Sequence, residues 1–129
     1  MIIKMDGRQY NVGAISGTLE ESFRVSDGPN TDTLITGEEV RDVIGTYYDH
    51  SLQIEPDMEH YQDYLDFYHD ISAPVASHTI TFPHEGGEIT YEAMVYSGAH
   101  SIVNAFMGMR VYTGLTVIFK AKAPQREAV

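Results

Sequence analysis

The segment 57–72 constrains the fold most strongly, because it has the pattern of an amphipathic helix. At about 100° per residue, one half of its helical wheel is apolar or aromatic. The residues on that half are Met58, Tyr61, Tyr64, Leu65, Phe67, Tyr68 and Ile71. Asp57 is placed to cap the first turn with its carboxylate, and Pro74 ends the pattern. The sequence therefore predicts one helix with a buried aromatic face, in which Leu65→Asp would unfold the domain.

The remaining chain alternates apolar and polar residues in short runs, which is typical of strands with one drier face. Asp6-Gly7 suits a type I′ turn in an opening hairpin, and Glu85-Gly86-Gly87-Glu88 separates two further alternating runs. Strands are predicted over residues 18–26, 45–55, 77–83, 89–95, 99–109 and 112–121. A short helical turn is predicted from Val40 to Ile44, after a polar segment with Thr36 as its cap.

This order of elements lacks the alternating strand–helix rhythm of parallel sheets. We therefore expect an α+β fold, mainly an antiparallel β-sandwich or half-barrel, flanked by the helix at about residues 57–72. A chain of 129 residues fits one domain, residues 1–129. The segment at about 122–129 is predicted to be a flexible C-terminal tail.

Composition excludes several classes of function. A net charge of -11 argues against binding nucleic acid through phosphate neutralisation, so no sequence-specific nucleic-acid binding is expected. No apolar run approaches the roughly 18 residues needed to span a bilayer, and residues 1–10 lack the apolar stretch of a signal peptide, so we expect a cytosolic protein without membrane contact. The absence of cysteine removes thiol catalysis and cysteine-ligated zinc.

The candidates for metal binding or acid–base chemistry are the histidines. The six are His50, His60, His69, His78, His84 and His100. Asp57 with His60, and Asp66 with His69, have a three-residue spacing that can bring two ligands together on a helix. No HExxH, EF-hand, GxSxG or glycine-rich phosphate motif accompanies them, so no metal, no cofactor and no catalytic residues are expected. An enzyme of unrecognised type would depend on His50, His60, His69 and His78.

Charge is distributed unevenly along the chain. Eleven acids and no lysine or arginine lie between Arg41 and Arg110, whereas four bases lie near the C-terminus. Opposed acidic and basic faces would favour head-to-tail assembly into rings, and a chance split in an acidic protein is the alternative. The candidate interface residues are Tyr47, Tyr48, Arg110, Lys120 and Lys122. The tyrosines are included because tyrosine is enriched at interfaces, and the three bases because they belong to the basic cluster. The candidate acidic face consists of Asp63, Asp66 and Asp70.

Several stretches resemble small tail-associated structural proteins of phages and prophages. They are Met5-Asp6-Gly7-Arg8-Gln9-Tyr10-Asn11-Val12, Arg41-Asp42-Val43-Ile44-Gly45-Thr46-Tyr47-Tyr48, Ser77-His78-Thr79-Ile80-Thr81-Phe82-Pro83 and the helix end Ile71-Ser72-Ala73-Pro74. The resemblance implies a tail-tube, distal-tail or baseplate type fold, with two antiparallel sheets flanked by a helix and rings that stack on other tail proteins. The resemblance implies no catalytic residues. It also implies that the protein is in the cytoplasm of the bacterial host during assembly and in the virion tail afterwards.

Two readings of the function follow. The first is a structural or assembly component of a phage tail or baseplate that acts through oligomerisation, in which Asp63, Asp66 and Asp70 would line an acidic lumen that repels DNA phosphates. The alternative is a monomeric domain that binds a small ligand or peptide in a cleft lined by Tyr61, Tyr64 and Tyr68.

Overall fold

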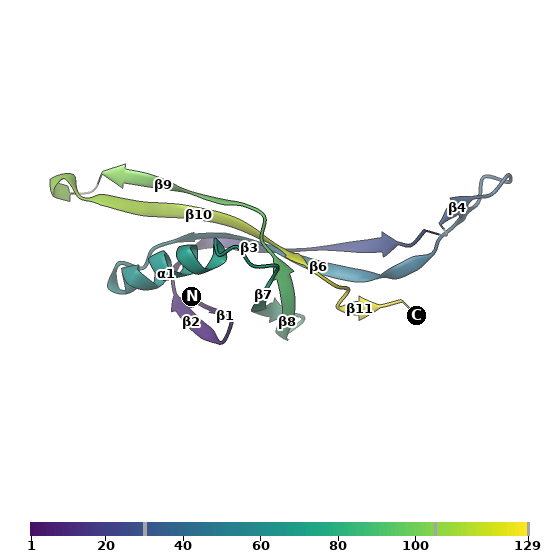
Figure 1. Cartoon of the computed structure of the whole chain (residues 1–129), viewed down its shortest axis with the longest axis horizontal. Coiled ribbons are helices and arrows are strands. Elements are labelled where there is room, and N and C mark those ends of the chain that lie inside the picture. The colour runs from purple at the N-terminus through teal and green to yellow at the C-terminus, as the bar shows by residue number, and fades with distance from the viewer. Residues whose placement is uncertain (30, 105, 129) are drawn as a thin grey trace.

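The chain forms one α-helix and a series of antiparallel strands (Figure 1). The computed structural model describes residues 1–29, 31–104 and 106–128, without the side chains of residues 14–18 and 106. Its strands are β1 (Ile2–Met5), β2 (Arg8–Asn11), β3 (Gly13–Asp27), β4 (Asp32–Thr33), β5 (Glu39–Val40), β6 (Val43–Glu55), β7 (His78–His84), β8 (Gly87–Met94), β9 (Gly98–Asn104), β10 (Arg110–Ala121) and β11 (Arg126–Glu127). The helical elements are the 3₁₀ turns η1 (Met58–His60) and η2 (Phe106–Gly108) and the helix α1 (Tyr61–Ile71).

Two long hairpin arms extend in opposite directions from the centre of the molecule (Figure 1). One arm consists of β3 and β6, with the small hairpin β4–β5 at its tip, and the other consists of β9 and β10. At the centre, Leu115 to Phe119 of β10 pair with Ile54 to His50 of β6. The two arms therefore share one run of four strands in the order β3, β6, β10, β9.

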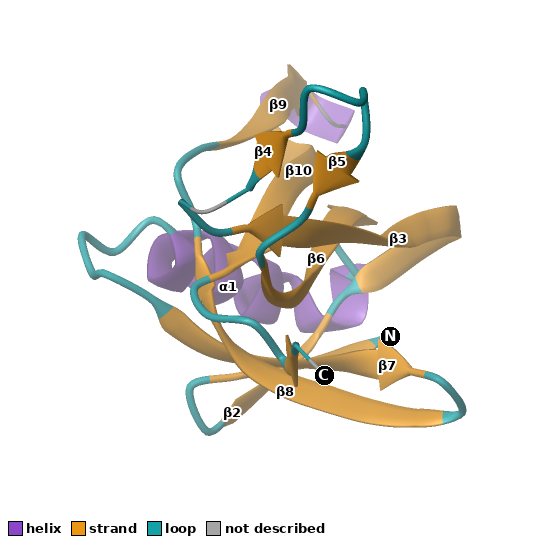
Figure 2. Cartoon of the chain, turned by 90° about the vertical axis from the view of Figure 1, so that its right-hand side faces the viewer, coloured by secondary structure: helices purple, strands orange, loops and turns teal. Residues whose placement is uncertain are grey.

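A second group of strands, β8, β7, β1 and β2, lies on the other side of α1 (Figure 2). It joins the first group where Lys120 and Ala121, at the end of β10, pair with Met94 and Ala93 of β8. The sheet thus turns around the helix instead of remaining flat. The prediction of an α+β fold, mainly antiparallel and with one helix, is confirmed.

Aromatic side chains fill the space between the helix and the two groups of strands. The Phe67 ring of α1 lies 5.2 Å from the Tyr10 ring of β2 and 6.5 Å from the Phe119 ring of β10, measured between centroids. Phe82 of β7 packs edge-on against Phe119 at 5.4 Å. Such aromatic pairs contribute about 0.5–1.5 kcal/mol each beyond the area they bury. Phe67 therefore connects the helix to both groups of strands.

The predicted helix is present as η1 followed directly by α1. Asp57 caps it as expected, because its side chain accepts a hydrogen bond of 3.2 Å from the backbone N–H of Glu59. The buried residues of α1 are Tyr64, Phe67 and Ile71. Leu65 is only partly buried at the edge of the core, and the side chain of Met58 is 64% exposed. The aromatic face is thus confirmed, with its centre at Phe67.

The turn predictions at glycine also hold. Asp6 and Gly7 adopt positive φ values of 51° and 80°, and Glu85 and Gly86 adopt 46° and 78°, as a type I′ turn requires. The predicted helical turn from Val40 to Ile44 is wrong. Residues 32–33 and 39–40 form the hairpin β4–β5, closed by Gly37 at a φ of 85°, and β6 starts at Val43. The β-branched residues in this segment favour the strand.

The C-terminal segment, for which the sequence predicts a flexible tail, is hydrogen-bonded along β6. β11 pairs Arg126 with Thr46 and Glu127 with Gly45. The Gln125 side chain extends this pairing, since its Oε1 accepts from the Tyr48 N–H at 3.0 Å and its Nε2 donates to the Tyr48 carbonyl at 2.9 Å. Residue 129 of the predicted tail, like residue 105 of the predicted strand 99–109, lies outside the described residues.

Gly45 allows this close approach, and Gly45→Ala is expected to displace the segment. A Cβ at position 45 would lie 2.6 Å from the Arg126 carbonyl oxygen and 2.8 Å from the Pro124 Cβ. The Gln125 and Ala128 amides donate to the carbonyls of Thr46 and Ile44. We expect both amides to lose protection from hydrogen exchange, and the free energy of unfolding to fall by about 1–3 kcal/mol. Hydrogen exchange followed by mass spectrometry measures this. Unchanged protection at both amides would contradict the packing.

Candidate functional site

The most distinctive surface consists of the two outer edges of the four-strand run. β3 pairs only with β6 and β9 only with β10 among the described strands, so each has one edge without a strand partner. Natural proteins normally protect such edges with charges, proline or a covering segment, because an open edge is a template for another chain. The two edges therefore mark a place where a further strand can add.

The β9 edge has none of these protections. Its sequence, Gly98 to Asn104, contains no proline and no Lys, Arg, Asp or Glu, and all its side chains are exposed except the partly buried His100. Ile102 and Val103 are 57% and 44% exposed. Past the end of this strand, Met107 and Met109 continue the exposed apolar surface toward β10. The β9–β10 arm thus exposes apolar side chains both on its edge strand and near its tip.

The opposite arm also exposes apolar side chains, but its edge carries charges. Phe23 on β3 is 72% exposed, and four further exposed apolar residues lie at or near the tip. They are Leu34, Ile35, Val40 and Ile44. Glu20, Glu21 and Arg24 place three charged side chains on β3. The two edges of the run are therefore chemically different from each other.

The predicted interface tyrosines are already covered by this chain. Tyr47 lies under the Arg24 guanidinium, 4.1 Å from its carbon to the ring centroid, and Tyr48 packs against His84 at 4.6 Å between centroids. Arg24 also donates to Asp49 at 2.9 Å and to the Ala121 carbonyl at 3.1 Å. Both tyrosines are half-buried by these contacts. They support the base of the β3–β6 arm.

The predicted interface bases are exposed but lie far apart. Arg110 starts β10 near the tip of its arm, whereas Lys120 and Lys122 lie at the other end of that strand. At about 3.3 Å per residue, Arg110 and Lys120 are separated by roughly 33 Å. Among the described residues, none of these three forms an ion pair, and neither does Arg126. These four basic side chains are therefore available to pair with acidic groups of another molecule.

The three residues of the predicted acidic face come together on α1, and they converge on Arg8 of β2. The Arg8 guanidinium lies 2.7 Å from Asp66, 3.5 Å from Asp63 and 4.0 Å from Asp70. The hydrogen bond from Arg8 lowers the pKa of the Asp66 carboxyl, and the same bond raises the pKa of Arg8. Asp70 also accepts from the Tyr10 hydroxyl at 2.6 Å. This face therefore joins the helix to β2.

Tyrosines of the predicted cleft gather around His100. Its ring stacks on Tyr68 at 3.9 Å and on Tyr112 at 4.5 Å, and its Nδ1 is 3.2 Å from the Tyr64 hydroxyl. Burial lowers the pKa of His100 and raises that of Tyr64 to about 12. Leu65, Tyr68, His100, Ile102 and Tyr112 line a hollow of about 440 Å³, whereas the Tyr61 hydroxyl accepts from the Tyr112 N–H.

The histidines of the enzyme hypothesis are not brought together. His50 is buried on β6, where its Nδ1 is 2.7 Å from the Tyr91 hydroxyl and its Nε2 is 3.0 Å from Glu21. The same Glu21 oxygen accepts from His84 at 2.8 Å. His78 bonds to Asp6, His60 to Asp57, and His69 is exposed on α1. Each lies in a separate cluster, so they form no common acid–base set.

The cluster around His50 predicts a dependence of stability on pH. Burial lowers the pKa of His50 in the folded protein from its ordinary 6.5. Below about pH 6.5 the unfolded chain therefore binds more protons at this residue, and stability that is fully present above that pH is lost as the pH falls toward the folded pKa. Denaturant unfolding at about pH 7.5 and about pH 5.5, on either side of the ordinary histidine pKa, measures this loss. An equal loss in His50→Gln would show that another group is responsible.

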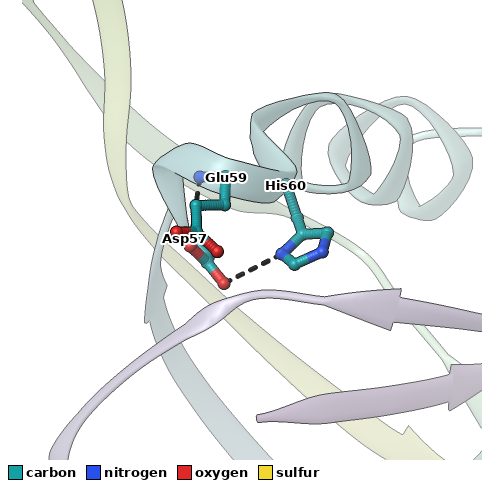
Figure 3. A group of neighbouring side chains, drawn as sticks. All are labelled: Asp57, Glu59 and His60. Atoms are coloured by element: carbon teal, nitrogen blue, oxygen red, sulfur yellow. Dashed lines mark hydrogen bonds and ion pairs between the residues drawn. The ribbon is translucent and has the colours of Figure 1, made fainter.

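Three groups at the start of the helix have the spacing of metal ligands. One ligand atom from each of Asp57, Glu59 and His60 lies within 4.8 Å of the others, and Figure 3 shows their arrangement. His60 Nδ1 is 3.0 Å from Asp57, which lowers the pKa of Asp57 and raises that of His60. Capping of the 3₁₀ turn accounts for Asp57, and all three groups face solvent. The predicted i, i+3 approach of Asp57 and His60 is therefore present, and Asp57 also caps the turn through the Glu59 N–H.

Sequence reasoning missed the residues that connect distant strands. Glu21 lies directly across from His50 in the β3–β6 register, and Asp6 meets His78 because β1 pairs with β7. The hairpin signal at Asp6-Gly7 located the first turn, but no local pattern gives the partner of β1. The open edges of β3 and β9 could not be identified either, since strand order is set by tertiary pairing.

Comparison of the sequence with protein-family models and with curated proteins finds no match. In the parts of the chain that the structure describes, no helix has both the length and the apolar character needed to cross a bilayer. The functional interpretation therefore depends on the geometry of this chain.

Proposed function

We propose that the protein is a structural subunit that assembles with copies of itself into a ring, through its two open strand edges. The observation that carries this proposal is the β9 edge, which is exposed, has no Asp, Glu, Lys or Arg, and presents Ile102 and Val103 on an arm that projects from the core (Figure 1). In the ring, β9 of one copy adds to β3 of the next. Main-chain hydrogen bonds then continue the four-strand run from subunit to subunit.

The difference between the two edges favours a ring over a simple two-fold dimer. A head-to-tail contact uses two different surfaces on each subunit and leaves one of each free until the ring closes. Here β3 carries charges and β9 carries none. A dimer through two β9 edges would leave β3 open in both copies, whereas a closed ring covers both outer edges of the four-strand run.

We further propose that this ring belongs to a phage or prophage tail or baseplate, with a tail-tube-like fold and no enzymatic activity. The resemblance of the sequence to tail-associated proteins supports this, together with the two-group sheet and flanking helix. Its partners would be itself and other tail proteins. The subunit would be made in the cytoplasm of the bacterial host and later reside in the virion tail, with Asp63, Asp66 and Asp70 facing the lumen.

One observation favours the alternative of a ligand-binding domain. The hollow of about 440 Å³ beside His100 is lined by Tyr68 and Tyr112, and its size lies within the range of small-molecule sites. Tyr61 and Tyr64, which the cleft hypothesis also includes, are engaged in hydrogen bonds inside the protein. In this alternative the protein stays monomeric and binds its ligand at the edge of α1.

Light-scattering mass across protein concentration and salt tests the proposal, followed by negative-stain imaging of any assembly. We expect a mass that rises with concentration to a closed oligomer and ring-shaped particles. A mass of 14.4 kDa at every concentration and salt would contradict self-assembly and favour the ligand-binding alternative.

A further inference from the structure

A hollow of about 510 Å³ lies between the first hairpin and the end of α1. The residues that line it include Asp6, Asp70, His78, Ala73 and Val75. We name it the Asp6–Asp70 hollow. The strand-edge contacts proposed above make no use of it, although Asp70 also belongs to the predicted acidic face.

His78 is the informative residue of this hollow. It is 4% exposed, and its Nδ1 donates to an Asp6 oxygen at 2.6 Å. The other Asp6 oxygen accepts from the Thr79 N–H at 2.8 Å, which fixes the carboxylate. With the proton held on Nδ1, a neutral imidazole has a lone pair on Nε2. In the neutral form of His78, the bond to Asp6 therefore leaves Nε2 as a hydrogen-bond acceptor.

Nε2 of His78 has no hydrogen-bond partner among the residues that the structure describes. No fully buried side-chain nitrogen or oxygen in that part of the chain lacks a partner, so this atom keeps some exposed surface, and His78 is one of the residues that line the hollow. A nearly buried acceptor that opens on a hollow without a protein donor calls for a donor from outside.

The second acceptor is Asp70. Its Oδ2 accepts from the Tyr10 hydroxyl, whereas its Oδ1 has no partner in the described part of the chain. Arg8 also borders the hollow, but its guanidinium is held by Asp66 at 2.7 Å and stacks over Tyr10. Its single positive charge is exceeded by the carboxylates of Asp6, Asp63, Asp66 and Asp70 around it.

We propose that the Asp6–Asp70 hollow binds a guanidinium group, with N–H donors to Nε2 of His78 and to the Asp70 carboxylate. A guanidinium carries five N–H donors in a rigid fork and can satisfy acceptors on different walls at once. Ligand atoms of Asp6, Asp70 and His78 do not lie within 4.8 Å of one another in the described chain, so they do not converge on a single metal ion. Ala73 and Val75 supply apolar contact for an alkyl stem.

Titration of the full-length, ¹⁵N-labelled protein with three probes tests this site. The probes are N-acetylarginine amide, its neutral isostere N-acetylcitrulline amide, and agmatine, a small molecule that carries a guanidinium group and a primary amine. We expect both guanidinium probes to shift the amide signals of Thr79 and the residues around Asp70 with saturation, and citrulline amide to cause no such shift. If arginine amide binds as tightly as agmatine, an arginine side chain of a polypeptide is sufficient for binding. If agmatine binds more tightly, the site favours a small guanidinium compound with a free amine.

Two variants and one control complete the test. Asp70→Asn should weaken binding about tenfold or more, the factor for losing one charge-assisted hydrogen bond. Asp6→Asn can still accept from Thr79, but its amide would donate to Nδ1 of His78 and move the imidazole proton to Nε2. Long-range ¹H–¹⁵N spectra of His78 detect that change of tautomer, and arginine amide should then no longer bind. Glu59→Gln loses the same charge at an exposed site outside the hollow and should bind as the wild type does.

Equal shifts from arginine amide and citrulline amide would overturn the proposal. So would wild-type affinity in Asp70→Asn, or retained binding in an Asp6→Asn variant whose tautomer has changed. The melting temperature and the amide spectrum of each variant show whether it is folded. If Asp70→Asn does not fold, Asp70→Ser replaces it. Assembly is measured by mass, so the failure of this site and the failure of the ring proposal are distinguishable.

Discussion

Ile102→Lys on β9 should leave the protein monomeric at concentrations where the wild type forms rings. The lysine places a charge on the strand edge that the next copy must cover, and Lys is one of the residues that natural edge strands use to prevent pairing. We expect the concentration needed for assembly to rise about a hundredfold, equivalent to about 2.8 kcal/mol per contact. Light-scattering mass across concentration measures this shift.

The chain offers a matched control at Ile118 on β10. Ile118 is 54% exposed and Ile102 is 57% exposed, but Ile118 pairs with Ser51 of β6 and lies on an inner strand, between the residues of β10 that pair with β9 and those that pair with β8. Ile118→Lys should therefore assemble as the wild type does. Val103→Lys, on the other face of β9, should fail as Ile102→Lys does. Assembly of both β9 variants at wild-type concentration would exclude this edge as the contact.

Phe67→Ala should lower the free energy of unfolding by about 3–5 kcal/mol, the usual cost of removing a buried aromatic ring. Phe67 has no exposed surface and contacts Tyr10 and Phe119, which lie in different groups of strands. The cavity would therefore loosen the helix from both groups at once. Urea unfolding followed by circular dichroism measures the change.

Met58→Ala is the control on the same helical segment. Because the Met58 side chain is 64% exposed, its truncation should change the free energy of unfolding by no more than about 0.5 kcal/mol. Leu65→Asp tests the core less sharply than Phe67→Ala, since Leu65 is only partly buried. A Phe67→Ala variant within about 1 kcal/mol of the wild type would show that the helix is not held by this contact.

Local patterns were sufficient for the elements whose causes are local. The helix follows from its apolar periodicity and the Asp57 cap, and the type I′ turn at Asp6-Gly7 follows from residues that accept positive φ. The alternation of β6 was also readable, because Leu52 and Ile54 are buried whereas Gln53 and Glu55 are exposed. In each case the deciding interactions lie within a few residues.

Elements decided by distant partners could not be predicted. β11 exists because Gly45 leaves room for Pro124 and Arg126, some eighty positions along the chain. The Asp6–His78 contact requires the pairing of β1 with β7, and the open edges require the complete strand order. The predicted turn from Val40 to Ile44 failed for the related reason that its residues pair across a hairpin.

The most direct test of the central claim uses the absence of cysteine in the chain. Ser22→Cys places one thiol on β3 and Ser101→Cys places one on β9, both at exposed positions. The two variants are mixed at a concentration that supports assembly and treated with a short bismaleimide. Ala76→Cys, exposed between α1 and β7, serves as the control partner.

Contact between the β3 and β9 edges predicts a covalent dimer when Ser22→Cys and Ser101→Cys are mixed, and little dimer when either is mixed with Ala76→Cys. Dimers of Ser101→Cys with itself in equal yield would indicate a two-fold contact through β9. No cross-linking of β9 to β3 in an assembled sample would contradict the ring contact proposed for this protein.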